Sequence, residues 1–278
     1  MFTVLELLKQ AQSSLQGPES RLEAELLMES FCGFSRSQQF AHPEKELTAE
    51  QVHKFSVALQ RRLSGEPMAH ITGSRGFWDM DLKVSADVLI PRPDTECLVE
   101  QALERIPVDA EWHIADLGTG SGAIALAIAR ERPRCEITAT DISDAAIEVA
   151  KENARSLIAE NVIFKAGSWE QALEESIFDM IVSNPPYICD DDPHLQQGDL
   201  PAEPITALIS GEDGLEAIRQ IIEGCQKNLK PGGWLLLEHG FDQADEVTSL
   251  LQIATHSEIF THRDFGGNNR VSGGRKAS

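Results

Sequence analysis

The sequence predicts an α/β fold, in which a doubly wound, mostly parallel sheet follows a small all-helical domain. Between residues 112 and 240, short apolar runs that suit strands alternate with helical patterns, as in successive βαβ units. Before residue 65, apolar residues recur only at helical spacing. A stretch rich in Gly and Pro separates the two patterns. We expect a helical domain over residues 1–72, a β-hairpin linker over 73–93 and a larger domain over 94–278.

The helical domain is predicted from two amphipathic stripes, the second of which begins at the capping-box pattern Thr48-x-x-Gln51. The stripes consist of Ala24, Leu27, Met28 and Phe31, and of Val52, Phe55, Leu59 and Leu63. Gly17-Pro18 divides the first helix from the second. No set of residues here suits catalysis, so we interpret the domain as a module that docks a substrate.

In the linker, Phe77-Trp78 and the run 82–84 indicate short strands. The chain then passes through Ile90-Pro91-Arg92-Pro93 into a helix that reaches Ile106. We expect Asp94-Thr95-Glu96 to cap this helix and to place acidic side chains in its first turn. The two flanking prolines would hold Arg92 rigidly near the domain junction.

The larger domain is expected to alternate strands and helices, with Ser143 capping the second helix. The expected strands are 112–117, 136–140, 162–164, 180–182 and 234–237, and the expected helices are 123–130, 143–157, 215–229 and 247–254. Residues 259–261 and 270–272 suit a terminal antiparallel pair. Ligands of such sheets bind at the carboxyl ends of the strands, where the strand order reverses.

A glycine-rich stretch, Asp116 to Gly122, follows the first strand of the series and opens its first helix. Its spacing is G-x-G-x-G, whereas dinucleotide-binding loops have G-x-G-x-x-G. Asp141 ends the next strand, about twenty residues on, where a carboxylate can hold ribose hydroxyls. A loop with no phosphate to bind can accept the amino-acid part of S-adenosylmethionine. The alternative is a structural glycine turn followed by an acidic residue at a helix N-terminus.

The stretch Ser183-Asn184-Pro185-Pro186-Tyr187 follows the apolar run 178–182. Two prolines cannot continue a strand, so the chain must turn away from the sheet there. The Asn184 side-chain oxygen and the Pro185 carbonyl can accept the two hydrogens of a planar NH2 group, and Tyr187 can pack against its face. The alternative is a loop that only ends a strand.

Composition excludes several classes of function. The net charge is −21, from 45 acidic and 24 basic side chains, and no Lys/Arg-rich run occurs, which disfavours a broad surface for duplex nucleic acid. No apolar run reaches membrane-spanning length, and residues 1–6 do not resemble a secretory signal. Five cysteines without a Cys-x-x-Cys pattern fit reduced thiols, and the eight histidines show no metal-ligand spacing. We expect a cytoplasmic, monomeric protein without a metal.

The chain resembles the class I S-adenosylmethionine-dependent methyltransferases, and more narrowly the PrmC or HemK family, which methylates glutamine N5 in peptide chain release factors. The resemblance covers nearly the whole chain, and the combination of motifs is far more specific than any one of them. The motifs are Gly65-Glu66-Pro67 to Gly73, Ile90 to Glu96, Asp116 to Gly122, Asn184 to Tyr187 and Leu237-Glu238-His239-Gly240. The resemblance implies a Rossmann-like, seven-stranded sheet, S-adenosyl-L-methionine as methyl donor, and the Gly-Gly-Gln motif of release factors as substrate.

The resemblance also implies the site residues. The cofactor would be bound by Asn184 and by Gly118, Thr119, Gly120, Ser121, Gly122, Asp141, Ser168 and Trp169, with the tryptophan beside the adenine. Ser168 stands where many members carry an acid, although a hydroxyl can accept the same hydrogen bond. The target glutamine would contact Asn184, Pro185, Pro186, Tyr187, Arg92 and Glu96. Asn184, Pro185 and Tyr187 would be the catalytic residues.

A carboxamide nitrogen is a poor nucleophile because its lone pair is delocalised. Two acceptors that fix its hydrogens would turn the lone pair toward the methyl group, so positioning and electrostatics would supply most of the catalysis. Four alternatives remain: a glutamine methyltransferase of a ribosomal protein, an adenine-N6 methyltransferase, a nicotinamide dehydrogenase and a non-catalytic translation adaptor. The sequence Pro93-Asp94-Thr95-Glu96 argues against the ribosomal-protein enzyme, and the acidic net charge argues against the adenine methyltransferase. The glycine spacing argues against the dehydrogenase, and the intact Asn-Pro-Pro-Tyr argues against the adaptor.

Overall fold

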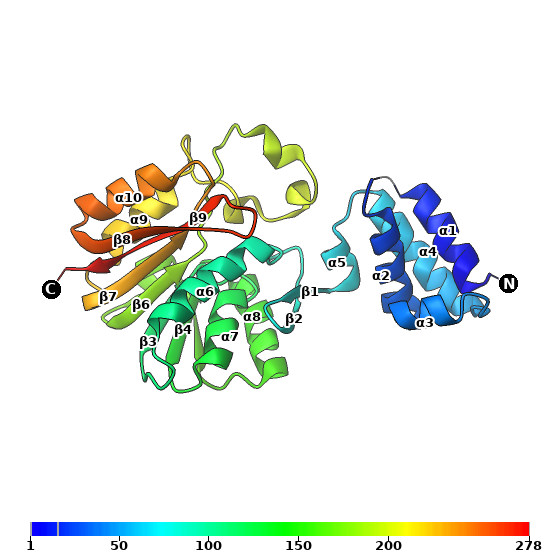
Figure 1. Ribbon diagram of the computed structural model, residues 1–278, viewed down its shortest axis with the longest axis horizontal. Helices are drawn as coiled ribbons and strands as arrows, with labels where there is room; N and C mark the ends of the chain where they lie inside the picture. Colours follow the sequence, from blue (N-terminus) through cyan, green and yellow to red (C-terminus); the bar gives the residue numbers. More distant parts are fainter. Residues whose placement is uncertain (1, 16, 278) are drawn as a thin grey trace. The chain divides into compact units, whose positions relative to one another are not determined.

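The computed structural model describes residues 2–15 and 17–277. By its internal contacts the chain divides into two compact units, Met1–Gly73 and Ser74–Ser278. The first unit is helical, and the second contains a sheet with helices on both faces (Figure 1). Within the described residues, no helix combines the length and the apolar character that crossing a membrane requires.

The first unit is a bundle of helices around one apolar core. Its helices are α1 (Val4–Ser14), α2 (Ser20–Cys32), α3 (Arg36–Ala41), α4 (Ala49–Leu63) and α5 (Met68–Thr72). Both predicted stripes contribute to the core, in which Leu27, Met28 and Phe55 are fully buried. The capping box at Thr48 is confirmed, since the Thr48 hydroxyl accepts a hydrogen bond from the Gln51 backbone N–H. One helical turn, α5, lies within the stretch that we predicted to break helix.

The second unit begins with the hairpin of β1 (Ser74–Phe77) and β2 (Met80–Lys83). The hairpin buries Phe77, Met80 and Leu82 in the same apolar core as the helices α6 (Glu96–Arg105) and α7 (Ala123–Glu131). At its turn, the Trp78 backbone N–H donates a hydrogen bond to the Glu96 carboxylate, at 2.8 Å. The hairpin is therefore joined to the larger unit by apolar contacts and by a hydrogen bond.

The main sheet has seven strands in the order β5-β4-β3-β6-β7-β9-β8. Their bounds are β3 (His113–Leu117), β4 (Glu136–Asp141), β5 (Val162–Ala166), β6 (Phe178–Ser183), β7 (Leu229–Glu238), β8 (His256–Arg263) and β9 (Asn269–Lys276). Strands β3 to β7 run parallel, and β9 is antiparallel to both of its neighbours. The predicted doubly wound, mostly parallel sheet and its terminal antiparallel pair are confirmed.

Helices cover both faces of this sheet. Alternate residues of β3 show the division, since Ile114 packs with α6 and α7, whereas Ala115 packs with α9 (Glu216–Gly224) and α10 (Ala244–Ile253). Helix α8 (Asp144–Leu157) lies on the first of these faces, and its N-cap is Ser143, as predicted. Short 3₁₀ turns fill the connections: η1 (Pro93–Thr95), η2 (Trp169–Leu173), η3 (Pro193–Gln196), η4 (Leu200–Ala202) and η5 (Ile205–Ala207).

Two local predictions are wrong. The helix expected over 215–229 ends at Gly224, and Leu229 instead begins β7, where it pairs with Phe178. A register shift between Phe178 and Met180 accommodates the Pro-Gly-Gly segment inside this strand. The expected cap of α6 is also absent, because Thr95 makes no side-chain capping bond. Its hydroxyl accepts a hydrogen bond from the Asn184 side chain instead.

Candidate active site

Two loops begin side by side at the centre of the sheet. Strands β3 and β6 are parallel neighbours, and their last residues, Leu117 and Ser183, are register partners. The buried Ser183 hydroxyl donates a hydrogen bond to the Leu117 carbonyl, at 2.7 Å. The strand order reverses here, because β4 lies on one side of β3 and β6 on the other. The glycine-rich loop and the Asn-Pro-Pro-Tyr loop therefore start at the same edge of the sheet.

Two carboxylates, Asp116 and Asp141, shape the glycine-rich loop. Asp116 is fully buried and accepts hydrogen bonds from the Thr119 hydroxyl (2.6 Å) and the Ala125 backbone N–H (3.2 Å). Burial raises the pKa of the Asp116 carboxyl to about 7, although these two bonds oppose the rise. Asp141, at the end of β4, accepts from the backbone N–H groups of Gly120 and Ser143, both at 2.9 Å. Burial also raises the pKa of Asp141, against the effect of these bonds.

A cavity of about 410 Å³ opens where the loop meets the ends of β4, β5 and β6. Predicted cofactor residues on its wall are Gly118, Gly120, Asp141, Ser168, Trp169 and Asn184. Its size is in the range of small-molecule sites, about 300–1,000 Å³. The other predicted cofactor residues lie behind the wall: Thr119 bonds Asp116, the Ser121 carbonyl accepts from Asn153, and Gly122 packs against Leu126 and Ala150.

Trp169 forms part of the cavity wall above the glycine loop. A Cβ on Gly118 would lie 3.2 Å from the Trp169 ring, and Gly118 has φ +71°, so this position favours glycine twice over. Trp169 itself has φ +41°, a left-handed conformation that is rare for a large side chain and is often found at functional sites. The Trp169 ring thus packs directly on Gly118, and both residues line the cavity together with Asp141.

A second, smaller cavity of about 60 Å³ adjoins the first and shares Leu89, Asn184, Pro186 and Ala207 with it. The residues predicted to contact the substrate that line it are Arg92, Asn184, Pro185, Pro186 and Tyr187. Glu96 lines neither cavity, and its carboxylate accepts the Trp78 bond of the hairpin. Of the residues predicted to contact the substrate, all except Glu96 therefore lie around this cavity.

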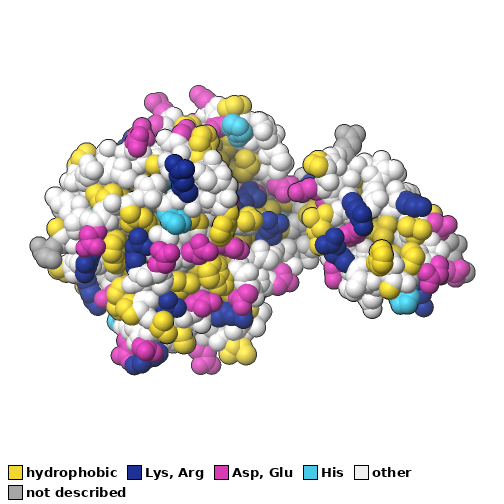
Figure 2. Space-filling model, in the orientation of Figure 1, with side chains coloured by type: hydrophobic (Ala, Val, Ile, Leu, Met, Phe, Trp, Pro, Cys, Tyr) yellow, Lys and Arg dark blue, Asp and Glu magenta, His cyan; other side chains and the backbone are white. Residues whose placement is uncertain are grey.

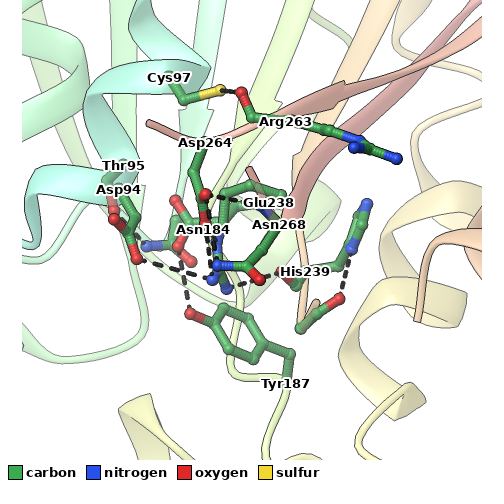
Figure 3. Close-up of polar contacts among 12 residues, drawn as sticks. Asp94, Thr95, Cys97, Asn184, Tyr187, Glu238, His239, Arg263, Asp264 and Asn268 are labelled. Carbon is green, nitrogen blue, oxygen red and sulfur yellow. Dashed lines mark hydrogen bonds and ion pairs between the residues drawn. The ribbon is translucent and has the colours of Figure 1, made fainter. Parts of the chain in front are cut away.

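Figure 3 shows how the side chains of the second cavity are held. The Asn184 amide NH2 donates to the Thr95 hydroxyl at 3.1 Å, and the Tyr187 hydroxyl donates to the Glu238 carboxylate at 3.2 Å. Burial, together with the neighbouring charge of Glu238, raises the pKa of Tyr187. With its NH2 held by Thr95, Asn184 offers its Oδ1 as an acceptor.

Arg92 forms an ion pair with Glu203 at 2.7 Å, and the Glu203 side chain is buried. Burial raises the pKa of the Glu203 carboxyl to about 7, while Arg92 opposes that rise. The pair connects the segment before α6 to the 3₁₀ turns after Tyr187. Each segment lines the larger cavity, through Ala86, Asp87, Val88 and Leu89 and through Pro204, Thr206 and Ala207. Sequence reasoning missed both segments, since neither carries a motif with a chemical role.

Basic side chains do not gather into a patch on the face that Figure 2 shows, where Lys and Arg are interspersed with Asp and Glu. Among the described residues several arginines form ion pairs, for example Arg134 with Glu111 and Arg219 with Asp213. This distribution suits local ion pairs better than a long phosphate backbone.

Comparisons with known proteins agree on both units. A model of the PrmC N-terminal domain matches residues 6–73, and a methyltransferase domain model matches residues 109–262. The chain is 49% identical to the release factor glutamine methyltransferase of Escherichia coli K12 over 269 residues, which cover 96% of this chain and 97% of that protein. It is 50% identical to the protein of the same name from Coxiella burnetii over 256 residues, or 92% of each chain.

The fold also has a structural relative of low sequence identity. The crystal structure of a methyltransferase from Pyrococcus furiosus superposes with a TM-score of 0.55 at 18% identity, and covers 80% of this chain and 100% of that one. At this identity the likeness concerns the fold, and it agrees with the strand order described above.

Proposed function

Because this chain belongs to the release factor glutamine methyltransferases, we propose that its two adjoining cavities hold the methyl donor and the target glutamine. The enzyme transfers a methyl group from S-adenosyl-L-methionine to the side-chain amide nitrogen of a glutamine in peptide chain release factors. The observation that carries the proposal is the position of Asn184, which is common to the walls of both cavities.

The larger cavity suits S-adenosylmethionine. The part of the cavity beside Trp169 would take the adenine, and the Asp141 carboxylate would accept hydrogen bonds from the ribose hydroxyls. The Ser168 hydroxyl, on the same wall, offers an acceptor for the adenine amino group. When bound, the cofactor supplies a methyl group attached to a sulfonium centre. After transfer of the methyl group, the rest of the cofactor is a neutral thioether.

The smaller cavity suits the glutamine side chain, and its residues would act on the amide directly. Asn184 Oδ1 and the Pro185 carbonyl would each accept one amide hydrogen, while the Tyr187 ring packs against the amide plane. These contacts would prevent rotation of the amide and aim its lone pair at the larger cavity. Positioning of this kind, together with exclusion of water, accounts for most of the rate enhancement that we propose. The methylated amide can lose its extra proton to water.

The test is single-turnover methyl transfer to a release factor by Asn184→Ala. Loss of one oriented contact in a water-excluded site should lower the rate about 100- to 1000-fold, equivalent to about 2.7–4 kcal/mol. Asn184→Asp should also be slow, because the added charge must be desolvated and attracts the sulfonium in the ground state. Cofactor affinity and the melting temperature are measured in parallel. A rate near that of the parent would refute the proposed amide binding.

Further proposals concern the setting of the reaction. The helical unit is proposed to dock the release factor, because it is separately packed and contributes none of the residues proposed to bind the cofactor or the target amide. We expect the enzyme to act as a monomer in the cytoplasm, where release factors work, and to bind neither duplex nucleic acid nor a membrane. The Gly-Gly-Gln motif of release factors is the proposed target sequence, which peptides with and without the glutamine would test.

A further inference from the structure

Two exposed phenylalanines lie on turns beside the amide site, and the function proposed above gives them no role. Among the described phenylalanine, tyrosine and tryptophan residues of the second unit, Phe241 and Phe265 are the exposed ones, at 63% and 74%. Single exposed apolar residues are common on protein surfaces, whereas aromatic residues are enriched at interfaces. The position of these two in the fold therefore decides whether they bind a partner.

Both phenylalanines lie at the edge of the sheet where the Asn-Pro-Pro-Tyr loop begins. Strand β7 is parallel to β6, so Phe241, which closely follows the end of β7, is at the same edge as Asn184. Strand β9 is antiparallel to both β7 and β8, so the turn that contains Phe265, between β8 and β9, is also at this edge. In the strand order, β7, β9 and β8 lie on one side of β6, and β3 lies on the other. The phenylalanines are thus on the β7 side of Asn184, and the glycine-rich loop is on the β3 side.

The turn that carries Phe241 is fixed to the backbone of Tyr187. The side-chain oxygen of Gln243 accepts a hydrogen bond from the Gly240 backbone N–H at 2.8 Å. The side-chain nitrogen of Gln243 donates to the Tyr187 carbonyl at 3.0 Å. A single amide side chain therefore closes the turn around Phe241 and holds it against the Asn-Pro-Pro-Tyr loop.

The turn that carries Phe265 is closed by the residue before it. The Asp264 backbone N–H donates to the Asn268 carbonyl at 2.8 Å, and the Asp264 carboxylate accepts the Asn268 backbone N–H at 2.9 Å. The same carboxylate forms an ion pair with Arg270 at 3.0 Å. Arg270 in turn donates to the His239 carbonyl at 3.2 Å, just before the turn of the other phenylalanine. The two turns are therefore linked to each other.

Arg270 also connects these turns to the amide site (Figure 3). Its guanidinium lies 3.6 Å from the carboxylate of Asp94. The next residue, Thr95, accepts a hydrogen bond from the Asn184 side chain at 3.1 Å. Exposed rings on turns that are held in this way need little ordering when a partner binds, so less of the binding free energy is lost as conformational entropy.

We propose that Phe241 and Phe265 bind the main chain of the release factor beside its target glutamine. This inference rests on the amide site proposed around Asn184. The glutamine is part of a polypeptide, so its neighbours must lie on the surface around the smaller cavity when its side chain enters. Three residues of extended chain span about 10 Å. The β3 side of Asn184 is assigned to the methyl donor, and the β7 side remains for the protein substrate.

The chemistry of the proposed target sequence fits two flat apolar rings. In Gly-Gly-Gln, two glycines precede the glutamine. Glycine has no side chain to keep the main chain away from an aromatic ring, and its conformational freedom lets the chain follow the surface. The phenylalanines would thus hold the chain next to the glutamine while Asn184 holds the amide.

Phe241→Ala and Phe265→Ala test the inference in the full-length enzyme. Loss of an aromatic anchor at an interface weakens binding about 5- to 30-fold, so the KM for a release factor should rise by such a factor, with a smaller effect on kcat. Phe241→Tyr and Phe265→Tyr keep the ring and should have nearly the parent KM. Cofactor affinity and melting temperature should not fall, because both side chains are exposed. A parent-like KM in both alanine variants would overturn the proposal.

Ile253→Ala is the matched control. Ile253 is 80% exposed at the end of α10, which leads from the end of β7 back to the start of β8 and so reaches the opposite edge of the sheet. Its KM should equal that of the parent. A peptide with the target glutamine and three residues on each side should show the same rise in KM with the phenylalanine variants as the intact factor does. A rise with the intact factor alone would contradict binding beside the glutamine.

A photoreactive side chain tests the contact directly. With p-benzoylphenylalanine in place of Phe265, the enzyme should crosslink to the release-factor segment around the glutamine, which mass spectrometry identifies. The same side chain in place of Ile253 should give no such crosslink. Crosslinks between two copies of the enzyme, together with dimers in sedimentation that Phe265→Ala dissociates, would show that a second copy covers this surface and would overturn the proposal.

The outcomes separate this inference from the function on which it rests. If both alanine variants have the parent KM while Asn184→Ala is slow, the role of the two phenylalanines is wrong and the amide site stands. If Asn184→Ala is as fast as the parent, the amide site is wrong, and the inference that depends on it is wrong as well.

Discussion

The backbone carbonyl of Tyr187 lies directly against Gly214. A Cβ at position 214 would sit 2.3 Å from that carbonyl oxygen and 2.7 Å from the Gln243 side-chain nitrogen. Gln243 Nε2 in turn donates a hydrogen bond to the Tyr187 carbonyl at 3.0 Å. The turn before α9 and the start of α10 therefore hold the backbone of the Asn-Pro-Pro-Tyr loop at Tyr187.

Gly214→Ala should destabilise the protein and slow methyl transfer, because the methyl group must displace the Tyr187 backbone. Gly211→Ala is the matched control. Both glycines have positive φ, +72° and +75°, but the only close contact of a Cβ at 211 would be the terminal Glu216 Oε2 at 2.9 Å, which can rotate away. The control should lose about 1 kcal/mol for the left-handed conformation alone. Equal melting temperatures for the two variants would refute the proposed contact.

Asp141→Ala should weaken S-adenosylmethionine binding by about 1–3 kcal/mol, the usual result of leaving polar groups unpaired. Part of this loss arises in the free enzyme, because Asp141 also accepts the Gly120 N–H of the loop. Asp141→Asn retains one acceptor oxygen and should bind with intermediate affinity. Calorimetry measures the affinities, and the melting temperature without ligand measures the effect on the loop. Unchanged affinity in the alanine variant would remove Asp141 from the cofactor site.

The buried carboxyl of Glu203 predicts a pH-dependent stability difference. Burial raises its pKa from 4.5 to about 7, so the folded state keeps a proton that the unfolded state has already released within this range. The parent should therefore lose stability as the pH rises from about 4.5 to 7, and each pKa unit corresponds to about 1.4 kcal/mol. Glu203→Gln does not titrate there. Its melting temperature minus that of the parent should increase between pH 5 and 7 and then level off, and a constant difference would contradict this.

Removal of residues 1–73 tests the docking role of the helical unit. The remaining unit has its own cores and retains both cavities, so its affinity for S-adenosylmethionine should be unchanged. Transfer to an intact release factor should fall sharply, because the docking surface is gone. Transfer to a short peptide that contains the target glutamine should change little. Equal rates of the truncated and full-length enzymes on the intact factor would exclude docking by this unit.

Much of the fold followed from local patterns. The β-rich and helical segments between 112 and 254 alternate clearly, and the capping residues Thr48 and Ser143 begin helices where expected. Leu229 was misassigned because a leucine at helical spacing from Cys225 equally suits the first residue of a strand. Only the pairing with Phe178, far away in the sequence, decides between the two.

The candidate site was predictable where one loop carries the chemistry, and not where distant segments meet. The spacing of Gly and Pro makes two loops recognisable in the sequence, residues 118–122 and 184–187. The partnership of Thr95 with Asn184 spans 89 positions, and that of Tyr187 with Glu238 spans 51. Local sequence patterns do not predict contacts between residues so far apart. Threonine is also a favoured N-cap residue, so the sequence predicted that the Thr95 hydroxyl would cap the helix rather than bind Asn184.

The placement of β9 between β7 and β8 bears on how the protein is made. This strand follows all the others in the sequence, yet Arg270, at its start, donates to the His239 carbonyl and influences the charge of Glu238. A ribosome therefore synthesises both binding loops, and the carboxylate behind them, before the strand that closes the sheet beside them. While the chain is growing, β7 has an open edge where β9 will pair. The enzyme is thus expected to become active only after β9 has been synthesised and has paired with β7.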